Sequence, residues 1–413
     1  MFPRFVQSRV EAALADTPVV LVNGPRQSGK STLVRMLADA AGVSYRTLDN
    51  ATTLAAATDD PEGFVSALSP AVALDEIQKA PRLFPAIKQA VDADRRGGRF
   101  LVTGSANVLL LPSLADSLAG RMQIVSLLPL SQGELRGRRE RFVEWAFGEE
   151  GPPDIPEDAG APGLADIVLA GGYPEVLTRP EADRRQAWHD SYLTAVLQRD
   201  VRDLANIQGL GDMPRLLTLL AARTGSLLNV SDVARSCGLP LSTLQRYLTL
   251  LETVFLFSPL PAWFVNIEKR LTKAPKVHLV DTGLAGFLMG IDADRVRRDP
   301  AAFGHLLEGF VLSEIRKHLS WSRVAAKPYH FRTASGQEVD IVLESRDGRV
   351  VGVEVKNSAT VGPRDFHGLS ALSDACGERF VRGIVLYRGR DVVPFGRFWA
   401  MPVEALWQIR EAV

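Results

Sequence analysis

The chain has 413 residues, of which 46% are hydrophobic and 23% are charged, and its 48 Lys and Arg balance 48 Asp and Glu. This composition is typical of an ordinary globular protein, and the length predicts roughly two to four domains. A chain without net charge is not built as a broad binder of polyanions, although a local basic face remains possible.

The cysteines and the apolar runs exclude two further classes of protein. Cys237 and Cys376 lie far apart without CxxC spacing, which argues against a disulfide framework or a zinc site and fits a reducing compartment. No apolar run reaches membrane-spanning length, and the N-terminus lacks the layout of a signal peptide. We therefore expect a cytoplasmic protein without a membrane partner.

Residues 1–147 alternate short apolar runs with amphipathic segments. VVLVNG, AVALDEI and FLVTGSA are predicted strands, and STLVRMLADA is the predicted helix that follows the first of them. Apolar strands separated by helices predict a parallel sheet with helices on both faces. We therefore expect an α/β fold for this first domain.

A glycine-rich segment joins the first strand to the helix after it. Residues 24–31, GPRQSGKS, match G-x-x-x-x-G-K-[ST] in a strand–loop–helix context. Backbone amides would surround phosphates at the helix N-terminus, Lys30 would reach the β and γ phosphates, and the Ser31 hydroxyl would bind Mg²⁺. The alternative is a plain glycine turn. The predicted ATP-binding residues here are Gly24, Pro25, Arg26, Gln27, Ser28, Gly29, Lys30, Ser31 and Thr32.

Acidic and polar residues end two other predicted strands. Asp75 and Glu76 end one strand, and Ser105 and Asn107 end another. The carboxyl ends of parallel strands form the edge where ligands bind. We predict that Asp75 holds the metal and that Glu76 polarises the attacking water, so that ATP is hydrolysed. Ser105 and Asn107 could sense the γ-phosphate. The alternative for the two acids is a solvated strand end.

GPRQSGKST, LDEIQ, LVTGSAN and SLAGRMQIVSLLPLSQGE together resemble AAA+ ATPases of the prokaryotic type, which are commonly fused to a C-terminal half catalogued only as a domain of unknown function. The resemblance covers essentially the whole chain. It implies that Arg121 is an arginine finger acting on a neighbouring subunit, and that Tyr173 and Pro174 belong to the lid element that touches the adenine. It also implies a homo-oligomer, since AAA+ proteins usually form rings. Arg121 as a surface or domain-packing residue, and the Gly-Pro pair as the start of a helix, are the alternatives.

Two further regions follow. Residues 148–205 combine the acidic loop GEEGPPDIPEDAGAPG with helices and form the predicted lid. In residues 206–275, SDVARSCG and LPLSTLQRYLTLLE predict two helices with a tight turn at Gly238, a helix-turn-helix pattern, with VFLFSPL and AWFVNI as a wing. The alternatives are a protein-docking module or an AAA+ lid. The expected shared core is Val233, Ala234, Cys237, Leu241, Leu244 and Leu248.

This middle region is locally basic. Between Asn206 and His278, eight Lys and Arg stand against four Asp and Glu. If the region binds DNA, salt-sensitive phosphate contacts are expected. The residues expected to make them are Arg235, Arg246, Lys269, Arg270 and Lys273.

Residues 338–356, EVDIVLESRDGRVVGVEVK, form a predicted hairpin. The alternation of VVGVEVK puts Glu354 and Lys356 on the face opposite its valines. A two-residue loop would place Asp340 on the other face, whereas a three-residue loop, 346–348, with Gly348 left-handed would pair Asp340 with Glu354. Facing carboxylates repel, so the second register requires a positive charge between them.

A divalent cation held by Asp340 and Glu354 would supply this charge. Mg²⁺, or Mn²⁺ in its place, prefers oxygen ligands, and Lys356 would position the nucleophile or neutralise the transition state. The arrangement resembles the core of PD-(D/E)xK nucleases, which implies a further acidic ligand on a preceding helix, here Glu308 in HLLEGFVLSEI. Val339, not proline, precedes Asp340. The alternative is a solvent face on which Lys356 simply pairs with Glu354.

The sequence thus predicts an AAA+ P-loop ATPase domain, a lid, a winged helix-turn-helix and, in residues 276–413, an α/β PD-(D/E)xK nuclease-like domain. The leading hypothesis is an ATP-hydrolysing protein that acts on DNA and cuts it with a metal-dependent endo- or exonuclease activity. The alternatives are an ATP-dependent oligomeric switch, and a translocase or helicase whose nuclease-like domain binds DNA without cutting it.

Overall fold

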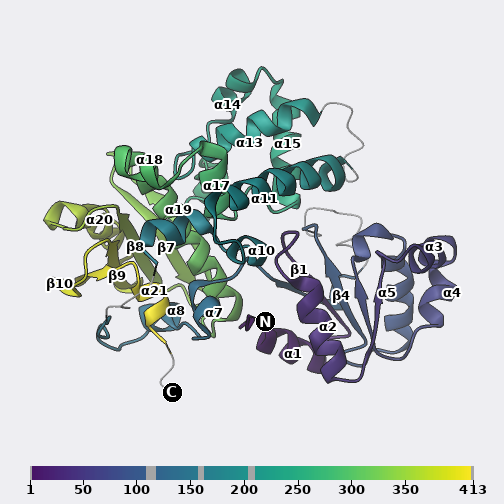
Figure 1. Cartoon of the computed structure of the whole chain (residues 1–413). Helices are drawn as coiled ribbons and strands as arrows, with labels where there is room; N and C mark the ends of the chain where they lie inside the picture. Colours follow the sequence, from purple (N-terminus) through teal and green to yellow (C-terminus); the bar gives the residue numbers. More distant parts are fainter. Residues whose placement is uncertain (1, 108–117, 157–161, 203–209, 411–413) are drawn as a thin grey trace.

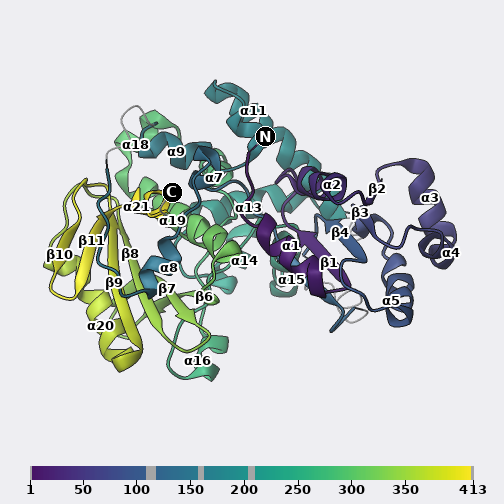
Figure 2. The same cartoon turned by 90° about the horizontal axis from the view of Figure 1, so that it is seen from below.

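The computed structural model describes residues 2–107, 118–156, 162–202 and 210–410. Two β-sheets lie at opposite ends of the molecule, and a group of helices lies between and beside them (Figures 1 and 2). The predicted boundary between residues 205 and 206, and part of the predicted acidic loop, fall outside the described residues.

The first sheet is parallel throughout, as predicted. Its strand order is β2-β3-β4-β1-β5. Every residue of β1, VVLVN, is buried, because helices cover both faces of the sheet. The strands are β1 (Val19–Asn23), β2 (Ser44–Thr47), β3 (Val72–Asp75), β4 (Phe100–Gly104) and β5 (Met122–Ser126).

Two sets of helices cover this sheet. Val10 and Val34 lie in the apolar cluster on one face, and Val65 and Ile87 lie in the cluster on the other face. The first face is covered by α1 (Gln7–Asp16) and α2 (Lys30–Ala40). The second is covered by α3 (Ala51–Asp59), α4 (Pro61–Ser66) and α5 (Leu83–Ala93), with the short η1 (Ile77–Lys79) after β3.

The chain leaves the first sheet after β5. The helices α7 (Gln132–Arg136) and α8 (Phe142–Phe147) lie beside the second sheet in Figure 1. The side chains of Phe142 and Phe147 belong to the apolar cluster that also contains Val351 of that sheet. The last two helices of the predicted first domain, residues 1–147, therefore pack on the C-terminal part of the chain.

The helix-turn-helix pattern is present. The helices α14 (Val230–Cys237) and α15 (Leu241–Thr253) are joined at Gly238, whose φ of 69° is left-handed. Five of its six expected core residues are buried, but Leu241 is 47% exposed and was wrongly placed in the core. It begins α15, so its side chain lies at the helix end, outside the face shared with α14.

The predicted wing is not found in the described part of the chain. Phe257 and Leu260 form isolated bridges to Leu279 and Lys276, and Ala262 forms one to His330. The two segments expected to pair with each other thus pair with later parts of the chain instead. This correction matters for the C-terminal site, because it brings Lys276 beside that site.

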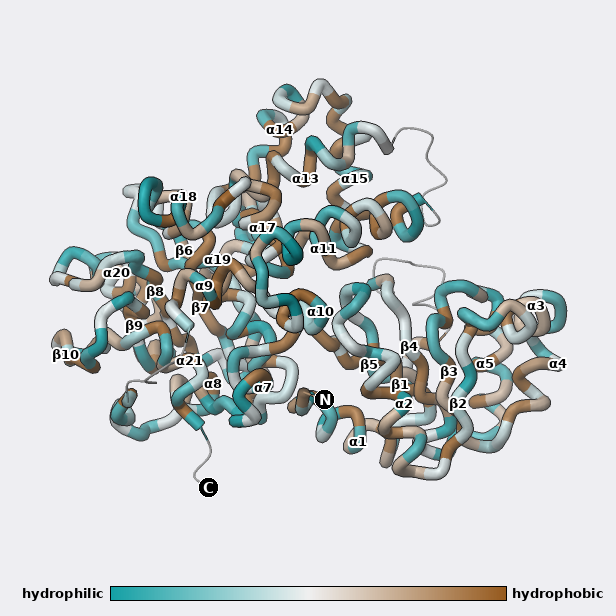
Figure 3. Tube along the Cα trace, in the orientation of Figure 1, coloured by the Kyte–Doolittle hydropathy of each residue, from teal (hydrophilic) through white to brown (hydrophobic). Residues whose placement is uncertain are grey.

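The other helices, which lie between or beside the two sheets, are mostly short. They are α9 (Leu164–Ala170), α10 (Pro174–Leu177), α11 (Ala182–Ala195), the π-helical η3 (Val196–Val201), η4 (Leu210–Asp212), α13 (Met213–Ala222), α16 (Ile267–Thr272), α17 (Thr282–Met289) and α18 (Ala293–Arg298). Figure 3 shows hydrophobic residues concentrated on β1, β3 and β4, and hydrophilic residues on α18. Among the residues described, no helix combines the length and apolar content needed to cross a bilayer.

The second sheet is mixed, with the order β10-β11-β9-β8-β7-β6. Leu369 of α20 (His367–Cys376) packs on one face, and Phe310 of α19 (Pro300–Trp321) packs on the other together with α21 (Ala405–Gln408). Its strands are β6 (Ala326–Arg332), β7 (Glu338–Ser345), β8 (Val350–Lys356), β9 (Phe380–Tyr387), β10 (Val393–Phe395) and β11 (Phe398–Pro402), with η5 (Pro363–Phe366) and η6 (Gly377–Arg379) at the ends of α20.

The close approach of α20 to β7 gives a test of this packing. A Cβ atom on Gly368 would lie 1.7 Å from the carbonyl oxygen of Glu338. Because the helix would have to shift, we expect Gly368→Ala to lower the free energy of unfolding by about 2 kcal/mol, measured by urea denaturation followed by tryptophan fluorescence. Gly362→Ala is the matched control, since a Cβ there meets nothing within 4 Å. Equal stability of the two variants would contradict the packing.

Candidate functional site

The phosphate-binding loop follows β1 and ends at the start of α2. Gly24 has a φ of 145°, and a Cβ there would lie 2.2 Å from the carbonyl oxygen of Leu127, so only glycine fits. Lys30 donates to the carbonyl oxygens of Gly24 and Pro25, both at 2.9 Å. Burial lowers the pKa of Lys30 to about 8, against the opposing charges of Glu76 and Asp75. The ammonium lies inside the loop that would hold the phosphates.

Asp75, at the end of β3, accepts hydrogen bonds from several hydroxyl groups. The donors are Ser31 at 2.9 Å, Tyr45 at 2.8 Å and Thr103 at 2.5 Å. The Ser31 hydroxyl and the Asp75 carboxylate are adjacent hard oxygen ligands, and they fit a Mg²⁺ ion that arrives with a nucleotide. The sequence indicated Ser31 and Asp75, but gave no reason to select Tyr45 or Thr103.

Glu76 has an unusual backbone conformation beside this site. Its φ of 61° is left-handed, and its amide donates to the Thr103 hydroxyl at 2.9 Å. Its carboxylate accepts hydrogen bonds from Ser105, at 3.0 Å, and from Gln78. The structure therefore brings together the strand ends that carry Glu76 and Ser105, and it adds Gln78, which the sequence analysis did not select.

The loop contacts parts of the chain that are distant in sequence. Arg26 forms an ion pair with Asp200 of η3 at 2.6 Å. The carbonyl oxygen of Ser28 accepts a hydrogen bond from Arg4 at 2.5 Å. The amide of Asn107 donates to the carbonyl oxygen of Thr253, at the end of α15, at 2.7 Å. Nothing in the local motif predicts these partners.

An apolar cavity of about 410 Å³ adjoins the loop and is large enough for a nucleotide base. Pro174 lines it, but the predicted partner Tyr173 does not: its side chain is fully buried and its hydroxyl lies 2.9 Å from that of Tyr192. The residues around the cavity are Phe2, Pro3, Arg4, Gln7, Ser28, Gly29, Thr32, Leu33, Met36, Leu130 and Pro174.

Arg121 lies at the opposite edge of the sheet. Its carbonyl oxygen accepts a hydrogen bond from Val19, the first residue of β1, whereas the loop follows the last residue of that strand. The guanidinium forms a bidentate pair with Asp92, at 2.7 and 3.1 Å. Arg121 therefore does not reach the nucleotide site of its own chain.

The β7–β8 hairpin has the register that a three-residue loop predicts. Ile341 pairs with Val353, which places Asp340 opposite Glu354. Ser345 bonds to Arg349 across the turn, and Gly348 is left-handed with a φ of 86°. The two carboxylates are therefore cross-strand neighbours on the same face of the hairpin.

Four side chains proposed from the sequence converge here in a pocket of about 650 Å³. They are Glu308 from α19, Asp340 from β7, and Glu354 and Lys356 from β8. The Lys356 ammonium lies 2.8 Å from a Glu354 carboxylate oxygen. Burial raises the pKa of both Glu308 and Glu354 to about 8, and the negative charge of Asp340 adds to the shift.

A fifth residue, Lys276, was not proposed for this site. Its ammonium lies 2.8 Å from Glu308 Oε1 and 2.9 Å from Asp340 Oδ1, and its side chain is only 4% exposed. Burial alone would lower the pKa of Lys276, but the charges of Asp340 and Glu308 outweigh it, so that this pKa is raised. The positive charge that the facing carboxylates require is thus supplied by the chain itself.

The donor set can now be compared with the needs of a metal. Three carboxylates are the hard oxygen ligands that Mg²⁺ or Mn²⁺ prefers. A divalent cation between Glu308 and Asp340 would occupy the place of the Lys276 ammonium, which already bonds both. In this arrangement the residues do not fit a metal.

The residues predicted to contact DNA differ in their availability. Arg270 forms a bidentate ion pair with Glu344, and its side chain is only 13% exposed, so it is not available to a DNA phosphate. Arg246, Lys269 and Lys273 are exposed, and so is the side chain of Arg235, which lies 3.5 Å from Asp232.

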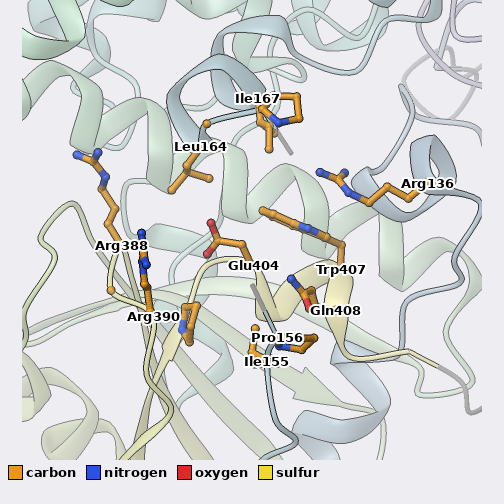
Figure 4. A pocket seen from close by; sticks show the side chains of 14 residues that line it. Arg136, Ile155, Pro156, Leu164, Ile167, Arg388, Arg390, Glu404, Trp407 and Gln408 are labelled. Carbon is orange, nitrogen blue, oxygen red and sulfur yellow. The ribbon is translucent and has the colours of Figure 1, made fainter. Parts of the chain in front are cut away.

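Another pocket, of about 320 Å³, was not indicated by any motif (Figure 4). Arg136 lies over the ring of Trp407, 5.2 Å from its centre, and the Glu404 carboxylate lies in the pocket with Arg388 and Arg390 at its side. Its residues come from α7, from the segment leading into α9 and α9 itself, from the loop after β9, and from the end of β11 through α21, so no contiguous stretch of sequence could have revealed it.

The parallel sheet, the phosphate-binding loop and the acidic strand end define an AAA-type P-loop ATPase, which binds ATP with Mg²⁺. Residues 16–136 match the family described as "AAA domain". The chain belongs to the family of an uncharacterized protein of Mycobacterium tuberculosis, Rv2008c. The two are 34% identical over 362 residues, which are 86% of this chain and 74% of the relative.

Other similarities concern parts of the chain. Residues 162–295 and 303–406 match families described as domains of unknown function, DUF8612 and DUF4143. An uncharacterized protein of Haemophilus influenzae is 24% identical over 59% of this chain and 56% of its own. The Walker-type ATPase of Pyrococcus abyssi is 16% identical, with a TM-score of 0.42 over 70% of this chain and 96% of its own. The RuvB branch migration motor of Thermotoga maritima is 18% identical, with a TM-score of 0.29 over 62% and 89%.

The apolar cavity can be tested as the site for the base. Met36→Trp would fill it, and we expect ATP affinity to fall about tenfold, because the base loses its place while the phosphate-binding loop is unchanged. Isothermal titration calorimetry with ATP and with inorganic tripolyphosphate separates the two contributions, and only the first should weaken. Asp39→Ala, at an exposed position of the same helix, is the control. Unchanged ATP affinity in Met36→Trp would exclude this cavity.

Proposed function

We propose that this ATPase acts on DNA and that its C-terminal part, residues 276–413, is a nuclease-like domain that cuts the DNA backbone. The observation that supports this best is the convergence of Asp340, Glu354 and Lys356 from one hairpin with Glu308 from α19. Like charges directly opposite each other on facing strands are destabilising, so their presence here favours a functional role. An open, acidic pocket with an attached lysine suits chemistry at a phosphodiester.

For ATP hydrolysis we propose the following roles. Lys30 exchanges its bonds to loop carbonyls for the β and γ phosphates, as an ammonium inside a phosphate-binding loop does. Glu76 orients and polarises the attacking water, and Ser105 holds its carboxylate in place. Asn107, two residues after Ser105 in the segment that follows β4, would respond to the γ-phosphate.

Arg121 suits a role between subunits of a homo-oligomer. Its place at the edge of the sheet opposite the loop suits an arginine finger that serves a neighbouring subunit. The pair with Asp92 would have to open when such a neighbour binds.

The helix-turn-helix is the proposed DNA-binding element. Its exposed cations Arg235 and Arg246, with Lys269 and Lys273 of the following segment, would contact phosphates and give salt-sensitive binding. Arg270 is left out of this set because Glu344 already neutralises it.

In the C-terminal pocket, Lys356 is the residue that would neutralise charge developing on a phosphodiester oxygen. Its side chain is 32% exposed and so remains accessible to a substrate. The Mg²⁺ or Mn²⁺ ion that the sequence predicts would fit between Glu308 and Asp340 only if both carboxylates were first released from the Lys276 ammonium.

One observation favours a second candidate function. Because Lys276 bonds Glu308 and Asp340, the site is already neutralised without a metal. A domain of this kind would bind DNA or a partner without cutting, and the chain would then be an ATP-driven switch or a translocase. A DNA cleavage assay distinguishes the two candidate functions, because only the nuclease-like domain would cut DNA.

The role of Glu76 gives the first test. Glu76→Gln retains the shape and the hydrogen bonds of this side chain but cannot polarise water, so we expect ATP hydrolysis to fall by about 100-fold or more while ATP still binds. Steady-state phosphate release and equilibrium ATP binding are the measurements. Glu62→Gln, on the exposed surface of α4, serves as the control. Hydrolysis at the wild-type rate would remove Glu76 from the mechanism.

The nuclease proposal is tested on single-stranded, linear and supercoiled DNA with Mg²⁺ or Mn²⁺, with and without ATP. We expect Glu354→Gln and Lys356→Ala to reduce cleavage by about 100-fold or more and to leave ATP hydrolysis unchanged, because each disrupts the Glu354–Lys356 pair, which would act only at the phosphodiester. Glu378→Gln, an exposed acid of the same domain, is the control. Absence of cleavage by the wild-type protein on every DNA would favour the switch.

A further inference from the structure

An ion pair joins the phosphate-binding loop to the helical part of the chain. The Arg26 guanidinium lies 2.6 Å from Asp200 Oδ1, although the two residues are 174 positions apart in the sequence. Both side chains are partly buried, with exposures of 24% and 18%. A pair shielded in this way is stronger than one in open solvent, but its remaining exposure leaves it accessible to a ligand.

The Arg26 side chain lies close to the place where phosphates would bind. Arg26 follows Gly24 and Pro25, whose carbonyl oxygens accept the hydrogen bonds from the Lys30 ammonium at 2.9 Å. Burial lowers the pKa of Lys30 most, and the charges of Arg26 and Asp200 also act on this pKa, in opposite directions. The ion pair is therefore near the ammonium that would contact the β and γ phosphates.

Asp200 belongs to a helical turn of an unusual kind. The six residues of η3 are π-helical and continue α11 without a break. Val196, Leu197 and Val201 are buried in the apolar cluster that also includes residues of α13. Turns of this kind are rare and frequently occur at functional sites. Asp200 is thus fixed to the helical part of the chain, whereas its partner belongs to the loop.

A bound triphosphate would compete with Asp200 for the Arg26 guanidinium. The backbone amides of such a loop surround the inner phosphates, so the oxygens left for a side chain of the loop belong to the γ phosphate. A guanidinium binds phosphate oxygens with two parallel hydrogen bonds, and the terminal phosphate carries more negative charge than one carboxylate. ADP has no γ phosphate and would leave the pair intact.

We propose that Asp200 is a positioning residue that holds Arg26 away from the nucleotide until the γ phosphate of ATP takes the guanidinium over. ATP, but not ADP, then releases the phosphate-binding loop from η3, and the helical part that carries the helix-turn-helix responds to the state of the nucleotide. The proposal rests on the phosphate contacts proposed for Lys30, and it does not depend on the action on DNA.

The test is isothermal titration calorimetry of the full-length protein in Mg²⁺, with ADP and with an ATP analogue whose β and γ phosphates are joined by an imido group. We expect Asp200→Asn to bind the analogue about tenfold more tightly than the wild type and to change ADP affinity less than about twofold, because only the γ phosphate competes for the guanidinium. Asp190→Asn removes the same charge at an exposed position of α11, and it should behave as the wild type does.

A double-mutant cycle assigns the effect to the ion pair. Arg26→Gln should weaken binding of the analogue, and Asp200→Asn in that background should leave the ratio of the two affinities unchanged, because no guanidinium remains for the carboxylate to hold. If Asp200→Asn does not fold, as judged by circular dichroism, Asp200→Ser replaces it in both measurements.

Two results would overturn the role of Asp200. One is an equal change in the affinities for the analogue and for ADP, since a carboxylate that acts only through its general charge or through structure would affect both. The other is the same change in their ratio with and without Arg26. Lys30→Ala separates this failure from that of the loop itself. If Lys30→Ala binds both nucleotides as tightly as the wild type does, the roles proposed for the loop are wrong and the role of Asp200 falls with them.

Discussion

Three buried carboxylates meet at the end of one hairpin, and the C-terminal half must place cations beside them because they repel one another. Glu308, Asp340 and Glu354 cannot all be charged at such a distance without cations beside them. Lys356 reaches Glu354 from the same strand, and Lys276 reaches the other two from a distant segment. The folded position of residues 275–279 is therefore tied to the neutralisation of these acids.

The ATPase site shows a different balance. Its carboxylates, Asp75 and Glu76, are surrounded by hydroxyl and amide donors from neighbouring strand ends. Such neutral donors stabilise a carboxylate without filling the place of a metal, so the site is ready for the Mg²⁺ that accompanies ATP. The two acidic sites thus differ in the source of their positive charge. The ATPase site takes it from the Mg²⁺ that binds with ATP, whereas the C-terminal pocket takes it from Lys276 and Lys356 of the same chain.

The sequence was sufficient wherever local pattern determines structure. The phosphate-binding loop, the parallel strands and the turn at Gly238 each follow from periodicity or turn chemistry over a few residues. The β7–β8 hairpin was predicted with two possible registers, and the structure has the one that pairs Asp340 with Glu354. The sequence did not predict contacts between residues that lie far apart along the chain. Nothing near Lys276 indicates that its ammonium reaches Asp340, and nothing near Tyr173 indicates that its ring is enclosed by other aromatic side chains. The wing was predicted from apolar runs, but those runs pair with the segment around Lys276, whose closeness only the tertiary fold creates.

The long helix α19 has a mechanical consequence. It carries Glu308 near its beginning and ends at Trp321, which packs edge-on against Phe5 at 5.6 Å, while Arg9 of α1 bonds the carbonyl oxygens of Leu319 and Ser320. A straight helix rises 1.5 Å per residue, so about 20 Å of rigid rod separates the acidic pocket from the nucleotide-binding lobe. Because a straight helix moves as a rigid body, a tilt of the nucleotide-binding lobe that pulls on the end of α19 would displace the Glu308 carboxylate.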